Sequence, residues 1–455
     1  MALAGKRVLV LGLGDTGLSV AEWVKHAGGQ ARVADTRAAP PRKKDFSGEL
    51  HAGKFKTGLL KDIDLLCISP GVSLQEELVQ AARGKNIPVV GDIELFAWAV
   101  RGKKMGKVLA VTGTNGKSTV TALTGHLLRV AGVDCEVAGN ISPPALDALM
   151  KRGKKLPAVW AVELSSYQLE TTWSLEPDAA VLLNLSEDHL DRYAGLAEYA
   201  EAKARIFMGT GAQVLNRCDS ASMALALPGR TQVTFGLDTP EMPEDFGVVK
   251  ETGGAWLVRG KERILAVADL PLAGAHNASN ALAACALAQL AGVPIASLAK
   301  GLRSFRGLPH RMQRVALRGD VEWLDDSKGT NVGATVAALN GLSRKTVLIL
   351  GGEGKGQDFA PLSSAIRARA KHVLLIGRDA GLIEKAVGAS GVPAERVASM
   401  EKAVARAAQI AAPGDAVLLS PACASFDMFR DYKHRGEAFA AAVNALGAFQ
   451  NGLKS

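Results

Sequence analysis

One stretch of the chain combines glycines, a lysine and hydroxyl side chains in the order that phosphate binding requires. It lies between an apolar run at 108–111, which predicts a buried strand, and a run at 120–130 that predicts a helix. Its members are Gly113, Thr114, Asn115, Gly116, Lys117, Ser118 and Thr119. Free N–H groups at a helix N-terminus attract an anion, Lys117 adds a positive charge, and the Ser118 hydroxyl can face Mg²⁺. The pattern predicts an ATP site, in a loop shorter than the Walker motif because Val111 stands where that motif has its first glycine.

A second glycine-rich turn lies near the N-terminus. Residues 7–11 predict a strand, Gly12-Leu-Gly-Asp-Thr-Gly17 matches G-x-G-x-x-G, and Asp35 ends the next predicted strand. This spacing is typical of a dinucleotide fold, in which the acidic residue contacts a ribose. Because the same geometry suits any nucleotide diphosphate, NAD is only one interpretation. Ser69-Pro-Gly71 follows a further strand and is placed to line the same crevice.

Carboxylates and a histidine stand at two other strand ends. Glu163 ends the apolar run 158–163, where an open α/β sheet places ligand groups and where Mg²⁺ finds oxygen ligands. The run 179–184 leads into Asp188-His189-Leu-Asp191, which suits a cation, although a lone histidine is more often structural. Lys203 lies on a predicted helix and is by default a solvated side chain.

Polar residues in the last 180 positions suggest further ligand contacts. Asn277 and Asn280 share one face near the start of a helix, where their amides suit an adenine edge but equally suit helix capping. Lys355 and Ser425 lie in loops after predicted strands, and a lysine with a hydroxyl forms a plausible carboxylate clamp. Taken alone, such loops are usually structural.

Length and composition bound the alternatives. A chain of 455 residues is too long for a single core, and its 48% hydrophobic and 22% charged residues are typical of a soluble globular protein. No apolar run approaches the roughly 18 residues of a membrane helix, and the N-terminus leads directly into a strand, so we expect neither membrane insertion nor a secretory signal. Five scattered cysteines indicate a reducing, cytoplasmic compartment. The net charge of +9 is spread along the chain and aromatics are only 5%, which favours phosphorylated and carboxylated small molecules over nucleic acid.

The alternation of strands and helices predicts an α/β protein of three domains, each with a mostly parallel sheet. We expect a Rossmann-like N-terminal domain at 1–97 and a P-loop ATPase-like central domain at 98–306. A Rossmann-like C-terminal domain follows at 307–455. Short apolar runs separated by turns at 212–267 predict a small antiparallel extension of the central sheet.

The motifs together resemble the Mur ligases, the ATP-dependent amino-acid ligases of peptidoglycan precursor synthesis. The resemblance covers essentially the whole chain. It rests on Thr112-Gly-Thr-Asn-Gly-Lys-Ser-Thr119, Glu163-Leu-Ser-Ser-Tyr-Gln-Leu-Glu170, Glu187-Asp-His-Leu-Asp-Arg192, Gly274-Ala-His-Asn-Ala-Ser-Asn280 and Leu308-Pro-His-Arg311. Further stretches are similar to the branch of the family that adds D-glutamate. These are Leu11-Gly-Leu-Gly-Asp-Thr-Gly-Leu-Ser19, Asp35-Thr-Arg37, Ser69-Pro-Gly71, Asp326-Ser-Lys-Gly-Thr-Asn331, Gly352-Glu-Gly-Lys355 and Ser420-Pro-Ala-Cys-Ala-Ser425. Asp15 and Phe426 stand where we expect leucine in such sequences, and these departures affect only loop contacts.

The resemblance implies substrates and roles. UDP-N-acetylmuramoyl-L-alanine, D-glutamate and ATP would be joined through an acyl phosphate, with two Mg²⁺ ions, by a monomer. Catalysis would involve Lys117, Asn140, Glu163, His189 and Lys203, the last as a carbamate. Metal ligands would be Ser118, Glu163, His189 and Lys203. ATP would be held by residues 113–119 together with Asn277, Asn280, Arg311 and Asp326. The uridine substrate would contact Gly14, Asp15, Thr16, Asp35, Thr36, Arg37, Ser69, Pro70, Gly71, Asn140 and His189. D-glutamate would contact Lys328, Thr330, Lys355, Ser425 and Phe426.

Three alternatives remain open at this stage. Another amide ligase of the superfamily, such as a folylpolyglutamate synthase or a sibling Mur ligase, is the strongest, although a complete nucleotide-diphosphate crevice argues for a UDP-linked substrate. An NAD-dependent dehydrogenase is supported only by the first glycine motif and Asp35, and it leaves the loop at Gly113 without a role. A nucleic-acid binder is supported only by the net charge of +9.

Overall fold

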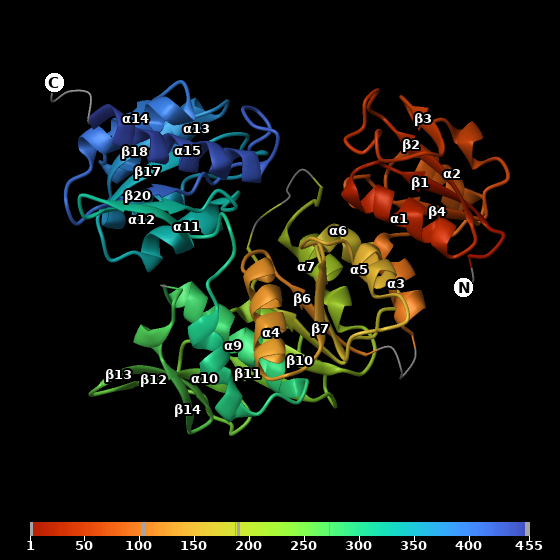
Figure 1. Cartoon of the computed structure of the whole chain (residues 1–455), viewed down its shortest axis with the longest axis horizontal. Coiled ribbons are helices and arrows are strands. Elements are labelled where there is room, and N and C mark those ends of the chain that lie inside the picture. The colour runs from red at the N-terminus through yellow and green to blue at the C-terminus, as the bar shows by residue number, and fades with distance from the viewer. Residues whose placement is uncertain (1–2, 102–105, 187, 189–191, 273, 451–455) are drawn as a thin grey trace. The chain divides into compact units, whose positions relative to one another are not determined.

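The computed structural model describes residues 3–101, 106–186, 188, 192–272 and 274–450, with side chains described to residue 446 (Figure 1). By contacts between its residues the chain forms two compact units. The first comprises 1–185, 197–269 and 280–304, and the second comprises 186–196, 270–279 and 305–455. The first unit contains two sheets and the second contains one. Among the described residues, no helix combines the length and the apolar character needed to cross a membrane.

The first sheet has five parallel strands in the order β3-β2-β1-β4-β5, the order of a Rossmann-like half. Val8 to Leu11 in the central strand are completely buried, as expected for a strand covered on both faces by helices. The strands are β1 (Arg7–Leu11), β2 (Gln30–Asp35), β3 (Glu49–Ala52), β4 (Leu65–Ile68) and β5 (Val89–Val90). The helices are α1 (Asp15–His26), η1 (Thr57–Leu60), α2 (Glu77–Gly84) and α3 (Asp92–Val100).

The second sheet has nine strands in the order β14-β13-β12-β11-β10-β9-β6-β8-β7. Its register pairs Val111 with Glu163 and Thr112 with Leu182, so that β8 and β9 flank the strand that leads into the phosphate loop. The strands are β6 (Lys107–Thr112), β7 (Cys135–Gly139), β8 (Val159–Glu163), β9 (Ala179–Leu182), β10 (Ala212–Asn216), β11 (Gln232–Phe235), β12 (Phe246–Glu251), β13 (Gly254–Arg259) and β14 (Glu262–Ala266).

The antiparallel extension is smaller than the stretch 212–267 predicted from turn spacing. Strands β10, β11 and β12 continue the parallel sheet, and only β12, β13 and β14 pair antiparallel. The local pattern of short apolar runs is the same for both pairings, so strand direction depends on long-range contacts. The helices of this part are α4 (Lys117–Val130), α5 (Ala145–Arg152), α6 (Ser166–Leu169), α7 (Leu196–Ala204), η2 (Arg205–Phe207), α8 (Ser220–Met223), η3 (Val267–Asp269), α9 (Ala275–Leu290) and α10 (Ile295–Ser304).

Buried polar contacts join helix α3, beside the first sheet, to the segment that follows β8 in the second sheet. Asp92, which begins α3, accepts a hydrogen bond of 2.9 Å from Gln168 Nε2. Glu94 Oε2 accepts from the backbone N–H groups of Trp173 and Ser174 at 2.6 and 2.9 Å. Burial raises the pKa of Asp92 to about 6, because its charged form is poorly solvated there.

The third sheet lies in the second unit and has six strands in the order β15-β16-β20-β17-β18-β19. Its pairings are parallel except for the hairpin of β15 and β16. The strands are β15 (Gln313–Arg318), β16 (Val321–Asp325), β17 (Thr346–Gly351), β18 (Ala370–Ile376), β19 (Ala394–Arg396) and β20 (Ala416–Leu419). The helices are α11 (Val332–Gly341), α12 (Leu362–Arg369), α13 (Ala380–Val387), η4 (Gly388–Ser390), α14 (Met400–Ile410) and α15 (Tyr432–Gln450). Three sheets of mostly parallel strands confirm the predicted α/β class.

Candidate active site

The phosphate loop joins β6 to α4 and depends on two glycines. Gly113 has a φ of 151° and Gly116, the N-cap of α4, has a φ of 85°. A Cβ atom at Gly113 would lie 2.9 Å from the Cβ of Leu183, and one at Gly116 would lie 2.5 Å from Asn280 Oδ1. Any side chain at these positions would therefore strain the backbone and displace a neighbour.

The lysine of this loop lies over its own backbone. Lys117 Nζ donates to the carbonyl oxygens of Gly113 and Thr114 at 2.9 and 2.8 Å, which fixes the ammonium above the loop. Ser118 and Thr119 follow in the first turn of α4 and are both buried. The arrangement places one cation and the N-terminal dipole of a 14-residue helix at the same point, as an anion site requires.

Asn184, which comes two residues after β9, supports the loop from the side. Its Oδ1 accepts from the Asn115 N–H at 2.9 Å, its Nδ2 donates to the Asn115 carbonyl at 3.1 Å, and its own carbonyl accepts from the Thr114 N–H at 2.9 Å. The N–H groups of Thr114 and Asn115 are therefore already used within the protein. The sequence analysis did not select Asn184; its signal was that it ends an apolar run, as Glu163 does.

A second group of polar residues fixes the segment that carries Asn184. Asn216 Nδ2 donates to the Leu183 carbonyl at 2.7 Å, and Asp219 Oδ2 accepts from the Leu185 N–H at 3.0 Å. Both partners flank Asn184, so the ends of β9 and β10 hold this side chain in a defined position.

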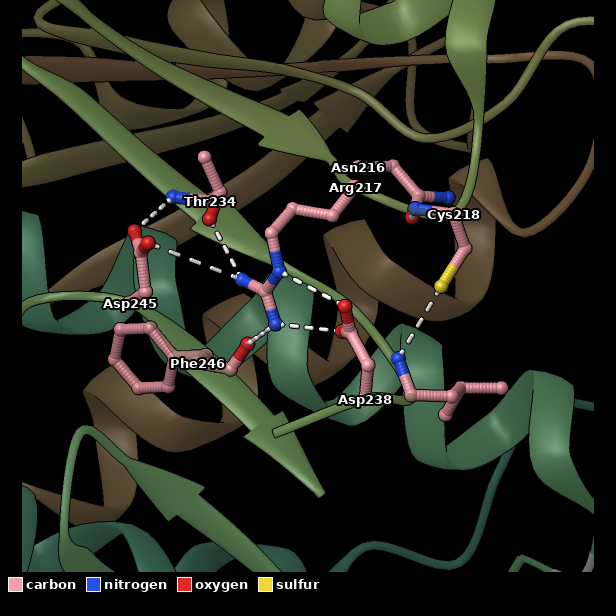
Figure 2. Close-up of polar contacts among 8 residues, drawn as sticks. Asn216, Arg217, Cys218, Thr234, Asp238, Asp245 and Phe246 are labelled. Carbon is pink, nitrogen blue, oxygen red and sulfur yellow. Dashed lines mark hydrogen bonds and ion pairs between the residues drawn. The ribbon is translucent and has the colours of Figure 1, made fainter. Parts of the chain in front are cut away.

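Arg217 links the ends of the neighbouring strands in turn (Figure 2). Its guanidinium donates to Thr234 Oγ1 at 2.6 Å, to Asp238 Oδ1 at 2.7 Å and to the Phe246 carbonyl at 3.0 Å. Figure 2 shows Asn216 directly before Arg217, at the same strand end. The arginine thereby connects the ends of β10, β11 and β12.

Glu163 is a buried carboxylate at the end of β8, and only 1% of it is exposed. Its Oε1 accepts from Asn140 Nδ2 at 2.9 Å, whereas its Oε2 is buried and has no hydrogen-bond partner among the described residues. A buried charged oxygen without a donor is costly unless it binds a cation. Glu163 therefore fits the role of a magnesium ligand. Mg²⁺ also accepts hydroxyl oxygens, and Ser118 carries one in the first turn of α4.

Lys203 does not occupy the solvated position that helix spacing alone suggests. It is 1% exposed, its Nζ donates to the Gly113 carbonyl at 2.9 Å, and it lies 4.6 Å from the centre of the Tyr199 ring. Burial beside the phosphate loop overturns the default expectation of a solvated side chain. Contacts with Thr112 and Gly113 at the end of β6, and not the local sequence, place this side chain.

The acidic stretch after β9 is described only in part. Asp188 Oδ2 accepts from Asn331 Nδ2 at 3.1 Å, within the second unit. His189, predicted as a metal ligand and a uridine-substrate contact, and Asp191 lie outside the described residues.

A pocket of about 700 Å³ opens at the glycine turn after β1. Of the residues predicted for the uridine substrate, it brings together all that the structure describes: Gly14, Asp15, Thr16, Asp35, Thr36, Arg37, Ser69, Pro70, Gly71 and Asn140. These residues come from the ends of β1, β2, β4 and β7, at the carboxyl ends where open α/β sheets bind ligands. A Cβ atom at Gly17 would lie 1.8 Å from the Gly12 carbonyl, which explains the last glycine of the motif.

Asp35 in this pocket is fully engaged by protein donors. Its oxygens accept from Arg37 Nε at 2.8 Å, Arg37 Nη2 at 2.7 Å and the Leu13 N–H at 2.7 Å. Burial by itself would raise the pKa of Asp35, but these donors outweigh it and lower the pKa to about 2. The dinucleotide interpretation needs this carboxylate for a ribose, so the structure disfavours NAD. Asp35 instead orients Arg37, whose side chain is 52% exposed.

The second unit carries most of the remaining predicted residues around the ends of β16, β17 and β20, whereas Asn280 on α9 belongs to the first unit. Asp326 Oδ2 accepts from Ser420 Oγ at 2.8 Å, and burial raises the pKa of Asp326 to about 7 although Arg311 and Ser420 act to lower it. Lys328 Nζ lies 4.0 Å from the centre of the Tyr432 ring. Asn277 is buried near the start of α9 and Asn280 lies one turn later.

The predicted D-glutamate residues lie on three loops of this unit. Lys328 and Thr330 follow β16, Lys355 follows β17 with a φ of 51°, and Ser425 and Phe426 follow β20. Ser425 is buried, whereas Phe426 is 65% exposed.

A buried arginine that the sequence analysis did not select joins two of these loops. Arg435 has no exposed surface, and its guanidinium donates to the Ser327 carbonyl at 2.8 Å and to the Cys423 carbonyl at 3.0 Å. Burial lowers the pKa of Arg435 to about 10. Its position on α15, more than a hundred residues from Ser327, gave no local signal.

The site combines a phosphate loop at the start of a helix, a buried carboxylate beside that loop, and a separate pocket large enough for a nucleotide. These features define a nucleotide-dependent α/β enzyme. Comparison with protein families makes this class specific. Three family models match in order along the chain: the MurD-like N-terminal domain of Mur ligases at 6–91, the Mur ligase middle domain at 111–288, and the glutamate ligase domain of Mur ligases at 310–423. The chain belongs to the Mur ligase family, which confirms the resemblance seen in its motifs.

Individual relatives match over nearly the full length. A protein of Nitrosospira multiformis named UDP-N-acetylmuramoylalanine--D-glutamate ligase is 53% identical and covers 100% of this chain and 98% of its own. The protein of the same name from Aromatoleum aromaticum is 53% identical, with 98% of each chain covered. The crystal structure of UDP-N-acetylmuramate-alanine ligase from Thermotoga maritima has a TM-score of 0.64 at 19% identity, covering 97% of this chain and 99% of that one, and supports the fold.

Proposed function

We propose that the chain ligates D-glutamate to UDP-N-acetylmuramoyl-L-alanine at the expense of ATP, yielding an amide, ADP and phosphate in peptidoglycan precursor synthesis. The observation that carries this proposal is the identity of about half of all positions, across both full lengths, with proteins named for that reaction. The sibling ligases and folylpolyglutamate synthases are less well supported, because the D-glutamate-adding name recurs among the relatives that match over the full chain.

We assign one substrate to the domain of each sheet. We assign the uridine substrate to the pocket of the domain at 1–97, ATP to the loop of the domain at 98–306, and D-glutamate to the loops of the domain at 307–455. The pocket of about 700 Å³ supports the first assignment, because it is large enough for a nucleotide and collects the residues expected for one.

In the proposed reaction the alanyl carboxylate attacks the γ-phosphorus of ATP, ADP leaves, and an acyl phosphate forms. The amine of D-glutamate then attacks the acyl carbon, phosphate leaves with the bonding electron pair, and the amine loses a proton. Carboxylate and amine do not condense readily in water, so phosphate supplies the leaving group. The protein contributes positioning and charge stabilisation.

Each residue at the loop has a distinct task in this proposal. Lys117, held above the loop, stabilises charge on the β- and γ-phosphates. Asn140 donates to Glu163 and contacts the muramoyl substrate and the transferring phosphate. Two Mg²⁺ ions would neutralise the phosphates, with Glu163 and Ser118 holding one and His189 the other. The partnerless Oε2 of Glu163 supports the first of these assignments.

Lys203 would support the metal site as a carbamate. The Lys203 ammonium would first lose one proton, and the neutral amine would then add to carbon dioxide with loss of a second proton, so that a buried cation becomes an anion. Asn277, Asn280, Arg311 and Asp326 would bind ATP. Lys328, Thr330, Lys355, Ser425 and Phe426 would bind D-glutamate. We further propose a cytoplasmic monomer that binds no nucleic acid.

Phosphate release tests the proposal directly. The full-length protein is incubated with ATP, Mg²⁺ and UDP-N-acetylmuramoyl-L-alanine, and D-glutamate, L-glutamate, L-lysine and diaminopimelate are compared as acceptors. We expect release with D-glutamate alone. Activity with another of these amino acids would overturn the specificity, and no release with any of them would overturn the reaction.

A further inference from the structure

The pocket at the glycine turn has an unusual charge for the ligand proposed to fill it. Among the charged residues that line it, one is a cation, Arg37, and three are carboxylates, Asp15, Asp35 and Glu76. The Arg37 guanidinium is already paired with Asp35 at 2.7 Å. The lining therefore has an excess of negative charge, whereas a uridine diphosphate group is itself an anion. Some other group must offset this repulsion.

Asp15 is the most exposed of the three carboxylates that line the pocket. It is the first residue of α1, directly after Gly14, and 74% of its side chain is exposed. A helix N-terminus favours an anion through its dipole and its free N–H groups. At this position the Asp15 carboxylate competes with a bound diphosphate for the same favourable field.

Arg42 offsets part of this excess of negative charge, at Asp15. Its Nε lies 2.8 Å from Asp15 Oδ1, and its backbone N–H donates to the Leu13 carbonyl at 3.2 Å. The contact with Asp15 is an ion pair, whereas Nη1 donates a hydrogen bond to Asp45 Oδ2 at 3.0 Å, so the guanidinium lies between two carboxylates. The segment around Arg42 is thus anchored to the glycine turn by both backbone and side chain.

We propose that Arg42 raises the affinity of the uridine pocket for its anionic ligand, because it pairs with Asp15 at the rim and offsets the charge of that carboxylate. The inference rests on the proposed function, which supplies the diphosphate. Arg42 acts through Asp15 and does not itself need to touch the ligand. Because the pair is exposed, the effect on affinity is limited to about 5-fold and weakens as salt screens it.

A double-mutant cycle on UDP binding to the full-length protein tests the inference. Isothermal titration at low salt measures the Kd of UDP for the wild type, Arg42→Ala, Asp15→Asn and the double variant. We expect Arg42→Ala to weaken binding about 5-fold, and less than about 2-fold when Asp15→Asn is already present. Arg7→Ala is the matched control, since it removes an arginine paired with Asp62 at 3.4 Å at the opposite end of β1, and it leaves the Kd unchanged.

The outcomes distinguish an Arg42 that offsets the charge of Asp15 from an Arg42 with another role. An equal loss in both backgrounds means that Arg42 binds UDP itself or supports the loop, which overturns the inference, as does an unchanged Kd for Arg42→Ala. Failure of the wild type to bind UDP overturns the proposed function and the inference together. The circular dichroism spectra of the four proteins show whether each variant is folded.

Discussion

Removal of the Asn184 side chain tests whether the phosphate loop is held in shape from the end of β9. Asn184→Ala deletes the hydrogen bonds of 2.9 and 3.1 Å to Asn115 and leaves the carbonyl contact to Thr114 intact. A net hydrogen bond is worth roughly 0.5–1.5 kcal/mol, so the two contribute about 2 kcal/mol to the ordered loop. If ATP binds only the ordered loop, its affinity falls by about 30-fold.

The assay compares the KM values for ATP and for the uridine substrate by phosphate release. We expect the KM for ATP to rise by about 30-fold, whereas the KM for the uridine substrate stays within about 2-fold, because the pocket at β1 does not involve Asn184. Gln232→Ala is the control: it also removes an amide-to-carbonyl bond of 2.9 Å, to Leu227, but in an exposed part of the same sheet.

Equal changes in both affinities would show a general loss of folding and refute the assignment of Asn184 to the loop. An unchanged KM for ATP would refute it as well, because the loop would then hold its shape through its glycines and Lys117 alone. Circular dichroism of the variant distinguishes the first case from a local effect.

Three further predictions concern charged side chains. Lys203→Ala loses activity, and short carboxylic acids partly restore it by replacing the carbamate; absence of rescue across a series of acids contradicts the carbamate role. Lys117→Ala abolishes turnover while UDP still binds by titration calorimetry, and loss of UDP binding too would contradict the assignment of ATP and uridine to separate sites. Asp92 has a folded pKa of about 6, above its usual value of 3.8, so its contribution to stability is present at low pH and is lost as pH rises through about 6. Relative to the wild type, Asp92→Asn therefore gains roughly 1–1.5 kcal/mol in free energy of unfolding between about pH 5 and pH 8, measured by urea denaturation; a parallel pH dependence of the two proteins would count against the raised pKa.

Local spacing was sufficient to predict several features of the molecule. The phosphate loop depends on Gly113, Gly116 and Lys117, which lie within five consecutive positions and act through backbone conformation and a helix N-terminus. The glycine turn at Gly12 is equally local. Because such motifs set their own geometry, the sequence alone indicated the α/β class, the two nucleotide sites and the family.

Other features depended on contacts between residues far apart in the chain. Asn184 reaches Asn115 across 69 positions, and Lys203 is buried against Gly113 across 90. Neither residue differs in its local sequence from an ordinary strand end or a surface lysine. The parallel direction of β10 and β11 is likewise set by pairing with β9 and β12.

Asp35 and Arg435 show most clearly the difference between what local sequence predicts and what long-range contacts decide. The sequence placed Asp35 at the position of a ribose-binding carboxylate, but the neighbouring Arg37 and the Leu13 N–H, brought together by the folded turn, consume its hydrogen-bonding capacity. Arg435 became visible only where α15 packs against the loops after β16 and β20. The sequence determined which chemical groups are present and the local turns that display them. The tertiary structure decided which groups are buried and paired, because burial and pairing are properties of residues that meet only in the folded chain.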